Sequence, residues 1–161
     1  MNQSANSPQP AVAAPHHTER FRVREFVRWG DIDQAGIICY GAYVRFFEIA
    51  ETEFFRAIGL PYAILFDRFD FWLPRVQLHF DFHRPALLDD LLEVEIWAGR
   101  VGRTSLRFEF CVHKVGGAIT AEGYEIVVAV NRRSFHPIGL PEELLTALAP
   151  YRADLRASPV S

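Results

Sequence analysis

The sequence predicts one α+β domain in which an antiparallel sheet wraps around a long central helix. Three observations lead to this expectation. Residues 43–58 repeat apolar side chains at helical spacing, later segments alternate apolar and polar residues, and short glycine-containing turns join those segments. The chain has 161 residues, of which 50% are hydrophobic and 14% aromatic, so one domain with a substantial core is expected.

The start of the chain, its charge and its cysteines narrow the class of protein. Residues 1–18 lack the basic start and apolar run of a signal peptide, so we expect a disordered tail there and a folded domain at 19–161. No stretch is long and apolar enough to span a bilayer, and the formal net charge is −3. Neither a membrane nor nucleic acid is therefore an expected partner. Cys39 and Cys111 favour two buried, reduced thiols in a cytoplasmic protein.

The first half of the chain predicts a strand, a loop and a helix. Residues 21–29 place apolar side chains among charges and are typical of a strand, with a break in the alternation near its middle. Residues 30–36 hold two glycines and two aspartates, which predicts a shaped loop. Residues 43–58 leave a polar arc of only about 80°, so this helix must be covered on most sides. Gly59 and Pro61 are typical helix stops.

The second half predicts a sheet. A short second helix or an irregular segment is expected at residues 62–69. Four strands with a period of two follow, at residues 76–82, 93–97, 105–112 and 124–130. Short turns such as Gly116-Gly117 make the later strands antiparallel neighbours, and Pro141 begins a C-terminal helix. Because one helix cannot cover the whole sheet and its edges are open, we expect a homo-oligomer.

One loop combines the groups that hydrolysis of an activated ester requires. Asp33 precedes the long helix by a few residues, and a helix start offers unpaired N–H groups and partial positive charge. A carboxylate can attack an acyl carbon or deprotonate a water that does so, while N–H groups hold the oxyanion. No metal is required. The same spacing also fits an ordinary cap or turn, so both interpretations stay open at this level.

Residues 28–43 form a longer motif that continues along the helix. They read Arg-Trp-Gly-Asp-Ile-Asp-Gln-Ala-Gly-Ile-Ile-Cys-Tyr-Gly-Ala-Tyr and are followed by Phe46-Phe47-Glu48 and Gly59-Leu60-Pro61. This motif closely resembles the signature of the 4-hydroxybenzoyl-CoA thioesterase family. The resemblance implies a hot-dog fold over about residues 20–150 and hydrolysis of an acyl-CoA to the free acid and CoA. It also implies no cofactor, and a dimer or a tetramer of paired dimers.

The resemblance also implies roles for individual residues. The family's catalytic aspartate falls on Asp33, as nucleophile or general base, and the oxyanion donor falls on the main-chain N–H of Tyr40. The carboxylate that bonds a substrate phenol falls on Glu48. Asp31 is expected to shape the loop.

Four departures from the family pattern concern the substrate. Gln34 stands in place of proline, Cys39 in place of a large aromatic residue, and Gly41-Ala42 in place of proline or histidine followed by asparagine. Glu48 is longer than the family's aspartate. The acyl pocket should therefore differ in shape, and a 4-hydroxybenzoyl group, another aryl group and a short acyl group all remain candidates.

A second segment is a candidate for binding CoA. Arg103, Thr104 and Ser105, with Arg100 just before them, lie in a turn and at the start of a strand. Relatives often bind the phosphates of CoA near this place, and arginine suits phosphate by charge and geometry. An ordinary solvated hairpin is the alternative interpretation.

Other functions remain open. Glu48 or Glu51 would be the base if the chain followed a second branch of hot-dog thioesterases. A non-catalytic acyl-CoA-binding module would use the same fold. A hot-dog dehydratase or hydratase would use a histidine, for which His79 and His83 are the candidates. A metal site at these two histidines lacks an obvious third ligand.

Overall fold

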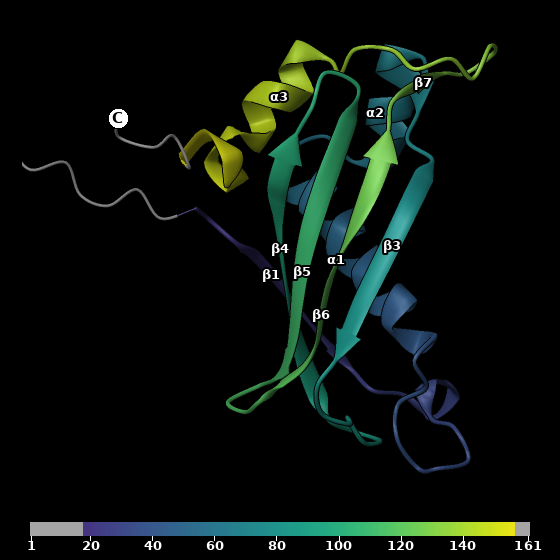
Figure 1. The fold of residues 1–161 in the computed structure, drawn as a ribbon, viewed down its shortest axis with the longest axis vertical. Helices are drawn as coiled ribbons and strands as arrows, with labels where there is room; N and C mark the ends of the chain where they lie inside the picture. Colours follow the sequence, from purple (N-terminus) through teal and green to yellow (C-terminus); the bar gives the residue numbers. More distant parts are fainter. Residues whose placement is uncertain (1–17, 157–161) are drawn as a thin grey trace, which may run out of the picture.

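A five-stranded antiparallel sheet curls around one long helix in the computed structural model, which describes residues 18–156 (Figure 1). The strand order is β1-β4-β5-β6-β3. The strands are β1 (Phe21–Phe26), β3 (Arg75–Phe82), β4 (Leu91–Val101), β5 (Ser105–Lys114) and β6 (Ile119–Val128). The predicted architecture is confirmed. All but the last residue of the tail expected at residues 1–18 lies outside the described part of the chain.

The central helix α1 (Ala42–Ala57) buries aromatic side chains against the inner face of the sheet. Phe47 stacks on Phe110 of β5, with ring centroids 3.8 Å apart, and on Phe80 of β3 at 4.7 Å. Phe54 contacts Phe108 in an edge-on arrangement. A fully buried phenylalanine contributes about 1.5–3 kcal/mol, so this row fixes how the helix lies across the strands.

Shorter elements complete the chain. They are the 3₁₀ turns η1 (Trp29–Asp31), η2 (Ala149–Tyr151) and η3 (Asp154–Arg156), the helices α2 (Tyr62–Phe69) and α3 (Glu142–Leu148), and the strand pair β2 (Phe71–Trp72) and β7 (Val130–Asn131). The helix at 62–69 and the C-terminal helix are thus present.

The predicted strands differ from the observed ones mainly at their ends: the strand predicted at 93–97 is longer and spans Leu91–Val101, and two others end or begin elsewhere. The strand predicted at 21–29 ends at Phe26, because the main chain of Asp31 turns back to Arg28 and forms a 3₁₀ turn. The strand predicted at 124–130 begins earlier, at Ile119, and is interrupted at Ala129, whose N–H donates to the carbonyl of Thr104 instead of to a ladder partner.

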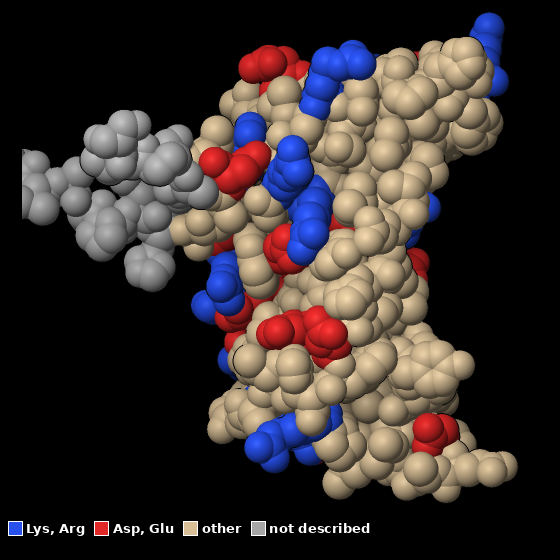
Figure 2. All heavy atoms as spheres, viewed as in Figure 1, with Lys and Arg blue, Asp and Glu red and all other residues tan. Residues whose placement is uncertain are grey.

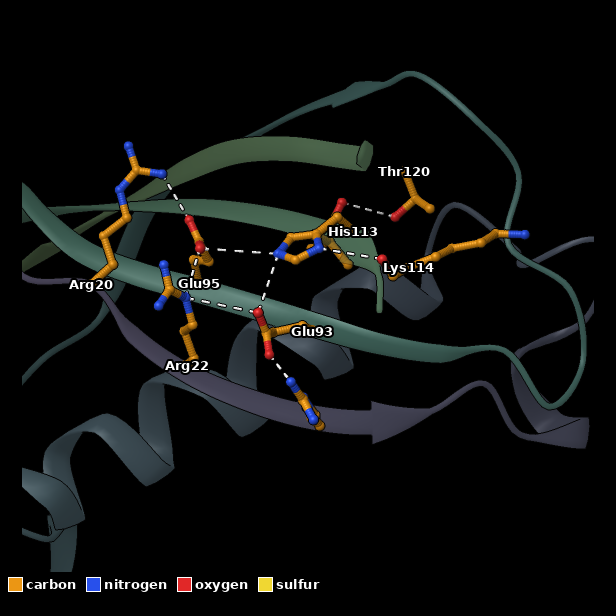
Figure 3. Close-up of polar contacts among 9 residues, drawn as sticks. Arg20, Arg22, Glu93, Glu95, His113, Lys114 and Thr120 are labelled. Carbon is orange, nitrogen blue, oxygen red and sulfur yellow. Dashed lines mark hydrogen bonds and ion pairs between the residues drawn. The ribbon is translucent and has the colours of Figure 1, made fainter. Parts of the chain in front are cut away.

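An ion-pair cluster on the outer face holds β1 to β4 (Figure 3). Glu95 accepts hydrogen bonds from Arg20 at 2.7 Å and from Arg22 at 2.8 Å, and His113 of β5 lies 3.5 Å from Glu93. The ligand atoms of Glu93, Glu95 and His113 lie within 4.8 Å of one another, a spacing that a metal ion could use. Because Arg24 also binds Glu93, arginines already neutralise both acids, and the cluster fits a structural role.

The edge strand β3 exposes apolar side chains. Val76 is 61% exposed, Leu78 41% and Phe82 52%. In the space-filling view, charged side chains gather over the left and centre of the molecule, and the right-hand edge, where β3 lies, is largely uncharged (Figure 2). An unpaired edge with apolar side chains favours pairing with another strand.

Candidate active site

The loop between β1 and α1 is held by Asp31, whose side chain is buried. Arg45 of α1 donates from Nε to Asp31 Oδ1 at 3.0 Å and from Nη2 to Oδ2, and the main-chain N–H of Arg28 donates to Oδ2 at 2.8 Å. The carbonyl of Asp31 accepts from the N–H of Cys39 at 2.7 Å. These bonds tie both ends of the loop to the helix start, so the loop-shaping role predicted for Asp31 is confirmed.

Asp33 occupies a tight turn at the tip of this loop. Its Oδ1 accepts a hydrogen bond from the N–H of Ala35 at 2.8 Å, and its carbonyl accepts from Gly36 at 3.0 Å. Gly36 has a φ of 75°, a conformation that glycine adopts without strain. Within residues 18–156, Oδ2 of Asp33 has no hydrogen-bond partner. The turn therefore orients the carboxylate and leaves one oxygen for chemistry.

The start of α1 presents unpaired amides beside this carboxylate. Gly41 is the N-cap residue and makes no side-chain capping bond. In the part of the chain that the structure describes, the N–H groups of Tyr40 and Gly41 donate to no acceptor. Unpaired N–H groups at a helix start are suited to binding an anion, so this mouth can hold an oxyanion.

A hollow of about 360 Å³ joins the carboxylate to the helix mouth. Its lining residues are Asp33, Ile37, Ile38, Tyr40, Tyr43, Phe82, His83, Arg84 and Pro85. Asp33 also borders a second hollow of about 420 Å³, which Trp29, Ile32 and Gln34 line. The first hollow therefore has Asp33 and Tyr40, the residue before the N-cap of α1, in its wall.

Tyr43 forms part of the wall and is not a base. Burial raises the pKa of its hydroxyl above the usual value of 10.0, although a hydrogen bond with Thr120 opposes the shift. The hydroxyl therefore stays protonated at neutral pH. Asp33 is the acid that borders the hollow.

The sequence did not associate His83 and Arg84 with Asp33. Both follow β3, and their main-chain N–H groups donate to the carbonyl of Thr120. His83 Nε2 lies 3.4 Å from Glu122, whereas the Arg84 guanidinium has no acidic partner among residues 18–156. Pro85 marked the end of this strand in the sequence, but only the packing of β3 against α1 brings that end to Asp33.

Several predicted site residues lie outside the hollow. Glu48 is exposed on α1, and half-buried Cys39 contacts the loop without lining the space. Both cysteines are free, as predicted, but each is only half-buried. Glu51, the alternative base, is buried, pairs with Arg75 and does not line the hollow. His79 pairs with Asp81 on the outer face, away from Asp33.

Arg103, Thr104 and Ser105 lie at the opposite end of the sheet from Asp33. Phe82, beside Asp33, is in register with Ala121, which is in register with Val112. Ser105 is seven residues from Val112 along β5, so these ends are roughly 23 Å apart. One protomer therefore does not bring this segment to the Asp33 hollow.

Within residues 18–156, no helix has the length and apolar character that crossing a membrane demands.

Comparison with known proteins identifies the family. The model of the thioesterase superfamily matches residues 35–121. The acyl-CoA thioester hydrolase YbgC of Escherichia coli is 28% identical over 130 residues, which cover 80% of this chain and 96% of that protein. The 1,4-dihydroxy-2-naphthoyl-CoA hydrolase of Synechococcus elongatus is 28% identical over 126 residues, which cover 77% of this chain and 91% of that protein.

Solved structures show the same fold. A 1,4-dihydroxy-2-naphthoyl-CoA thioesterase from Synechocystis superposes with a TM-score of 0.76 at 20% identity, over 81% of this chain and 96% of that one. A protein from Aquifex aeolicus superposes with a TM-score of 0.74 at 26% identity, over 80% and 98%. The hot-dog fold is thus confirmed. Because the family model matches more than half of the chain, the chain belongs to the thioesterase superfamily and is a thioester hydrolase.

Proposed function

We propose that this thioester hydrolase acts on an acyl-CoA, releases the free acid and CoA, and uses Asp33 as its catalytic carboxylate. One observation carries the proposal: Asp33 and Tyr40 border the same hollow, and the main-chain N–H groups of Tyr40 and of the next residue, Gly41, have no acceptor among the described residues. The relatives in Escherichia coli and Synechococcus elongatus, both named as hydrolases of CoA esters, support the choice of substrate class.

The proposed reaction begins at the thioester carbonyl. Oδ2 of Asp33 either attacks the carbonyl carbon or takes a proton from a water that attacks it. The carbonyl oxygen becomes an oxyanion that receives hydrogen bonds from the Tyr40 and Gly41 amides, and the CoA thiolate leaves as the carbonyl re-forms. One such donor is worth about a hundredfold to a thousandfold in rate. In the nucleophilic route, water then hydrolyses the mixed anhydride.

The acyl group is proposed to be an aryl group, such as 4-hydroxybenzoyl, or a short acyl chain. Tyr43, Phe82 and Ile37 give the hollow an apolar wall, and its volume of about 360 Å³ is near the lower end of small-molecule sites. Gly41 has open space around it, since an added Cβ would meet only the Cys39 sulfur, at 4.0 Å. Glu48 stays a proposed phenol ligand.

We propose a dimer in which β3 of one protomer pairs with β3 of the other in antiparallel register. The exposed apolar side chains of Val76, Leu78 and Phe82 support this edge as the interface. A two-fold axis near the middle of β3 would turn the far end of the partner's sheet towards Asp33. The segment Arg103–Ser105 would then come from the second protomer to bind CoA phosphates, with Arg84 as a nearer cation. A tetramer of such dimers would follow the family.

We propose a cytoplasmic location for the chain. The free state of Cys39 and Cys111 supports a reducing compartment.

The test of the proposed function is a panel of aryl- and alkyl-CoA esters, with thiol release as the readout. Replacing Asp33 with Asn should lower kcat by about 10²–10⁴-fold, because the amide can neither attack nor accept the proton. Asp81→Asn, on the outer face, is the matched control and should keep full activity. Unchanged turnover by the Asp33 variant would remove this residue from the mechanism. Binding of acyl-CoA without turnover by the wild type would favour a non-catalytic acyl-CoA-binding module.

A second candidate function is a hydratase or dehydratase, because His83 borders the same hollow as Asp33. A histidine beside a carboxylate can exchange protons with a hydroxyacyl substrate. The discriminating measurement is turnover of enoyl- and 3-hydroxyacyl-CoA. Activity that His83→Ala abolishes, in the absence of thiol release, would favour this candidate.

A further inference from the structure

Two acids and one arginine meet where α1, β3 and β6 come together. Glu51 of α1 is 1% exposed and Glu125 of β6 is 2% exposed, whereas the side chain of Arg75 is 44% exposed. Arg75 donates from Nη2 to Glu51 Oε2 and from Nε to Glu125 Oε2, the latter at 3.1 Å. We name these three residues the acid clamp. Neither acid borders the hollow of Asp33.

The acid clamp has too few donors for two ionised carboxylates. Nε and Nη2 form one edge of the guanidinium, the edge that a single carboxylate usually spans with both oxygens. Here the edge is divided between two carboxyl groups, so their Oε2 atoms are close neighbours. Within the described part of the chain, Oε1 of Glu51 and Oε1 of Glu125 are buried and have no hydrogen-bond partner. Buried polar atoms of folded proteins are nearly always paired.

Among residues 18–156, the surroundings add negative charge, and Arg75 is the cation that acts on Glu125. On α1, Glu48 is the other acid whose charge acts on this region, and on α2 the half-buried Tyr62 lies within reach of the charges of Glu125 and Glu48. Burial, with the charges of Glu125 and Glu48, raises the pKa of Tyr62, so its hydroxyl stays protonated. From β3 the facing charge is Arg75. Two carboxylates this close, with one cation between them, do not both ionise readily.

We propose that Glu51 and Glu125 share one proton at neutral pH, and that the Arg75 clamp between α1 and the edge strand β3 weakens as that proton is lost. A shared proton forms a hydrogen bond between the two buried carboxyl groups. The pair then carries one negative charge, which the single guanidinium of Arg75 balances. The pair then resembles a carboxyl dyad, in which one acid is neutral and the other ionised.

The sign of the pH dependence follows from the raised affinity for the proton. Burial raises the pKa of Glu125 above its usual value of 4.5, and the charge and hydrogen bond of Arg75 only partly oppose the shift. The folded chain therefore binds one proton more than the unfolded chain at pH values between those two pKa values. The contribution of this proton to stability is fully present below the unfolded pKa and is lost as the pH rises through the folded pKa, and over that range it raises the unfolding constant by up to tenfold per pH unit.

The clamp also has a consequence for the proposed active site. Arg75 begins β3, and the residues that end and follow this strand, Phe82 to Pro85, line the Asp33 hollow. A looser clamp would free the edge strand that forms one wall of the site.

The experiment measures unfolding in urea from about pH 5 to pH 9 for the wild type, Glu125→Gln and Glu53→Gln. Glutamine copies a neutral carboxyl group at every pH, so Glu125→Gln should gain stability relative to the wild type as the pH rises. The unfolding constants should diverge by up to tenfold per pH unit. Glu53 pairs with Arg56 on the exposed side of α1, so the free energy of unfolding of Glu53→Gln should change with pH as that of the wild type does.

Parallel curves for Glu125→Gln and the wild type would overturn the proposal. Infrared spectroscopy of the wild type at pH 7 gives an independent test, because a buried protonated carboxyl group has its own carbonyl stretch. That band should be present in the wild type and in Glu53→Gln, and absent from Glu51→Gln as well as from Glu125→Gln if the variants fold. A wild type without the band would overturn the proposal whether or not any variant folds. None of these readouts depends on thioesterase activity.

Discussion

Asp31 and Asp33 stand two residues apart and do different things. Asp31 is buried and receives hydrogen bonds from Arg45 and the main chain of Arg28, so its oxygens are occupied in holding the loop. Asp33 is exposed, and only one of its carboxylate oxygens, Oδ1, accepts a hydrogen bond within the turn. Asp31 thus fixes the loop, and the second oxygen of Asp33 remains free to contact a substrate.

Replacement of Asp31 should separate the structural role from the catalytic one. Asp31→Asn weakens two charge-assisted bonds from Arg45, which leaves a partly buried guanidinium with only the longer ion pair to Glu25, at 3.9 Å. We expect a loss of about 1–3 kcal/mol in the free energy of unfolding, measured in urea, together with reduced kcat. Asp33→Asn is the contrasting variant and should stay within about 0.5 kcal/mol of the wild type, because its position is exposed. Equal stability of the two variants would contradict the assigned roles.

At this scale the sequence was informative where a local motif carried the signal. The loop around Asp33 and a helix from residue 43 follow from neighbouring residues, whereas the place of Tyr40 beside the helix start came from the resemblance to the family; the helix begins at Ala42. His83 and Arg84 could not be joined to them, because that contact depends on how β3 packs against α1. The acid clamp was equally hidden, since Glu125 looks like an ordinary polar residue in an alternating strand.

At the scale of elements, β1 depends on ion pairs as well as on its ladder. Burial alone would raise the pKa of Glu95, but hydrogen bonds and charge from Arg20 and Arg22 outweigh it and hold the pKa below its usual value of 4.5. The ionised form is therefore the one that the folded state favours. Its contribution to stability is present above the unfolded pKa and is lost as the pH falls through the folded pKa.

The prediction for β1 concerns acid unfolding. Glu95→Gln should be less stable than the wild type by about 1 kcal/mol at pH 7, a modest figure because both arginines are about half exposed. The difference should close as the pH falls from the unfolded pKa through the lower folded pKa of Glu95, because the wild-type carboxylate then takes up a proton. Unfolding followed by circular dichroism at both pH values checks this. Glu143→Gln, which breaks an exposed pair, should show little difference at either pH, and a gap for Glu95→Gln that persisted in acid would contradict the assignment.

The elements were largely predictable because their periodicities are strong. The helix α1 and the four later strands follow from apolar spacing. The ends of the strands were harder to predict. β1 ends at Phe26 and the last strand is interrupted at Ala129, because the main chain there forms hydrogen bonds with residues outside the sheet ladder. Such bonds leave no trace in local composition.

At the scale of the whole molecule, the uncovered edge at β3 predicts assembly. Leu78→Glu places a charge in the proposed two-fold interface, and because Leu78 is 41% exposed the protomer should still fold. Light scattering should show a dimer or larger for the wild type and a shift towards monomer for the variant, with at least tenfold weaker association for a desolvated charge pair. Val115→Glu, at an exposed apolar position outside β3, should leave assembly unchanged. A monomeric wild type would contradict the interface and the shared CoA site.

The wrapped-sheet architecture could be predicted because the strands that follow the helix along the chain can curl around it and cover its apolar sides. Which protomer brings each end of the sheet to the site could not be predicted from the sequence. Arg103 and Asp33 belong to different ends, and a resemblance in sequence carries no information on which protomer supplies each of them.

Trp29 gives the molecule a built-in optical reporter. It is 82% exposed and borders the hollow on one side of Asp33, whereas Trp72 and Trp97 each lie under an arginine. Its indole is therefore the one most open to quenching by water, and a molecule seated in that hollow would shift its fluorescence to shorter wavelength. Occupancy beside the carboxylate can thus be followed in unlabelled protein, even with CoA compounds that are never cleaved.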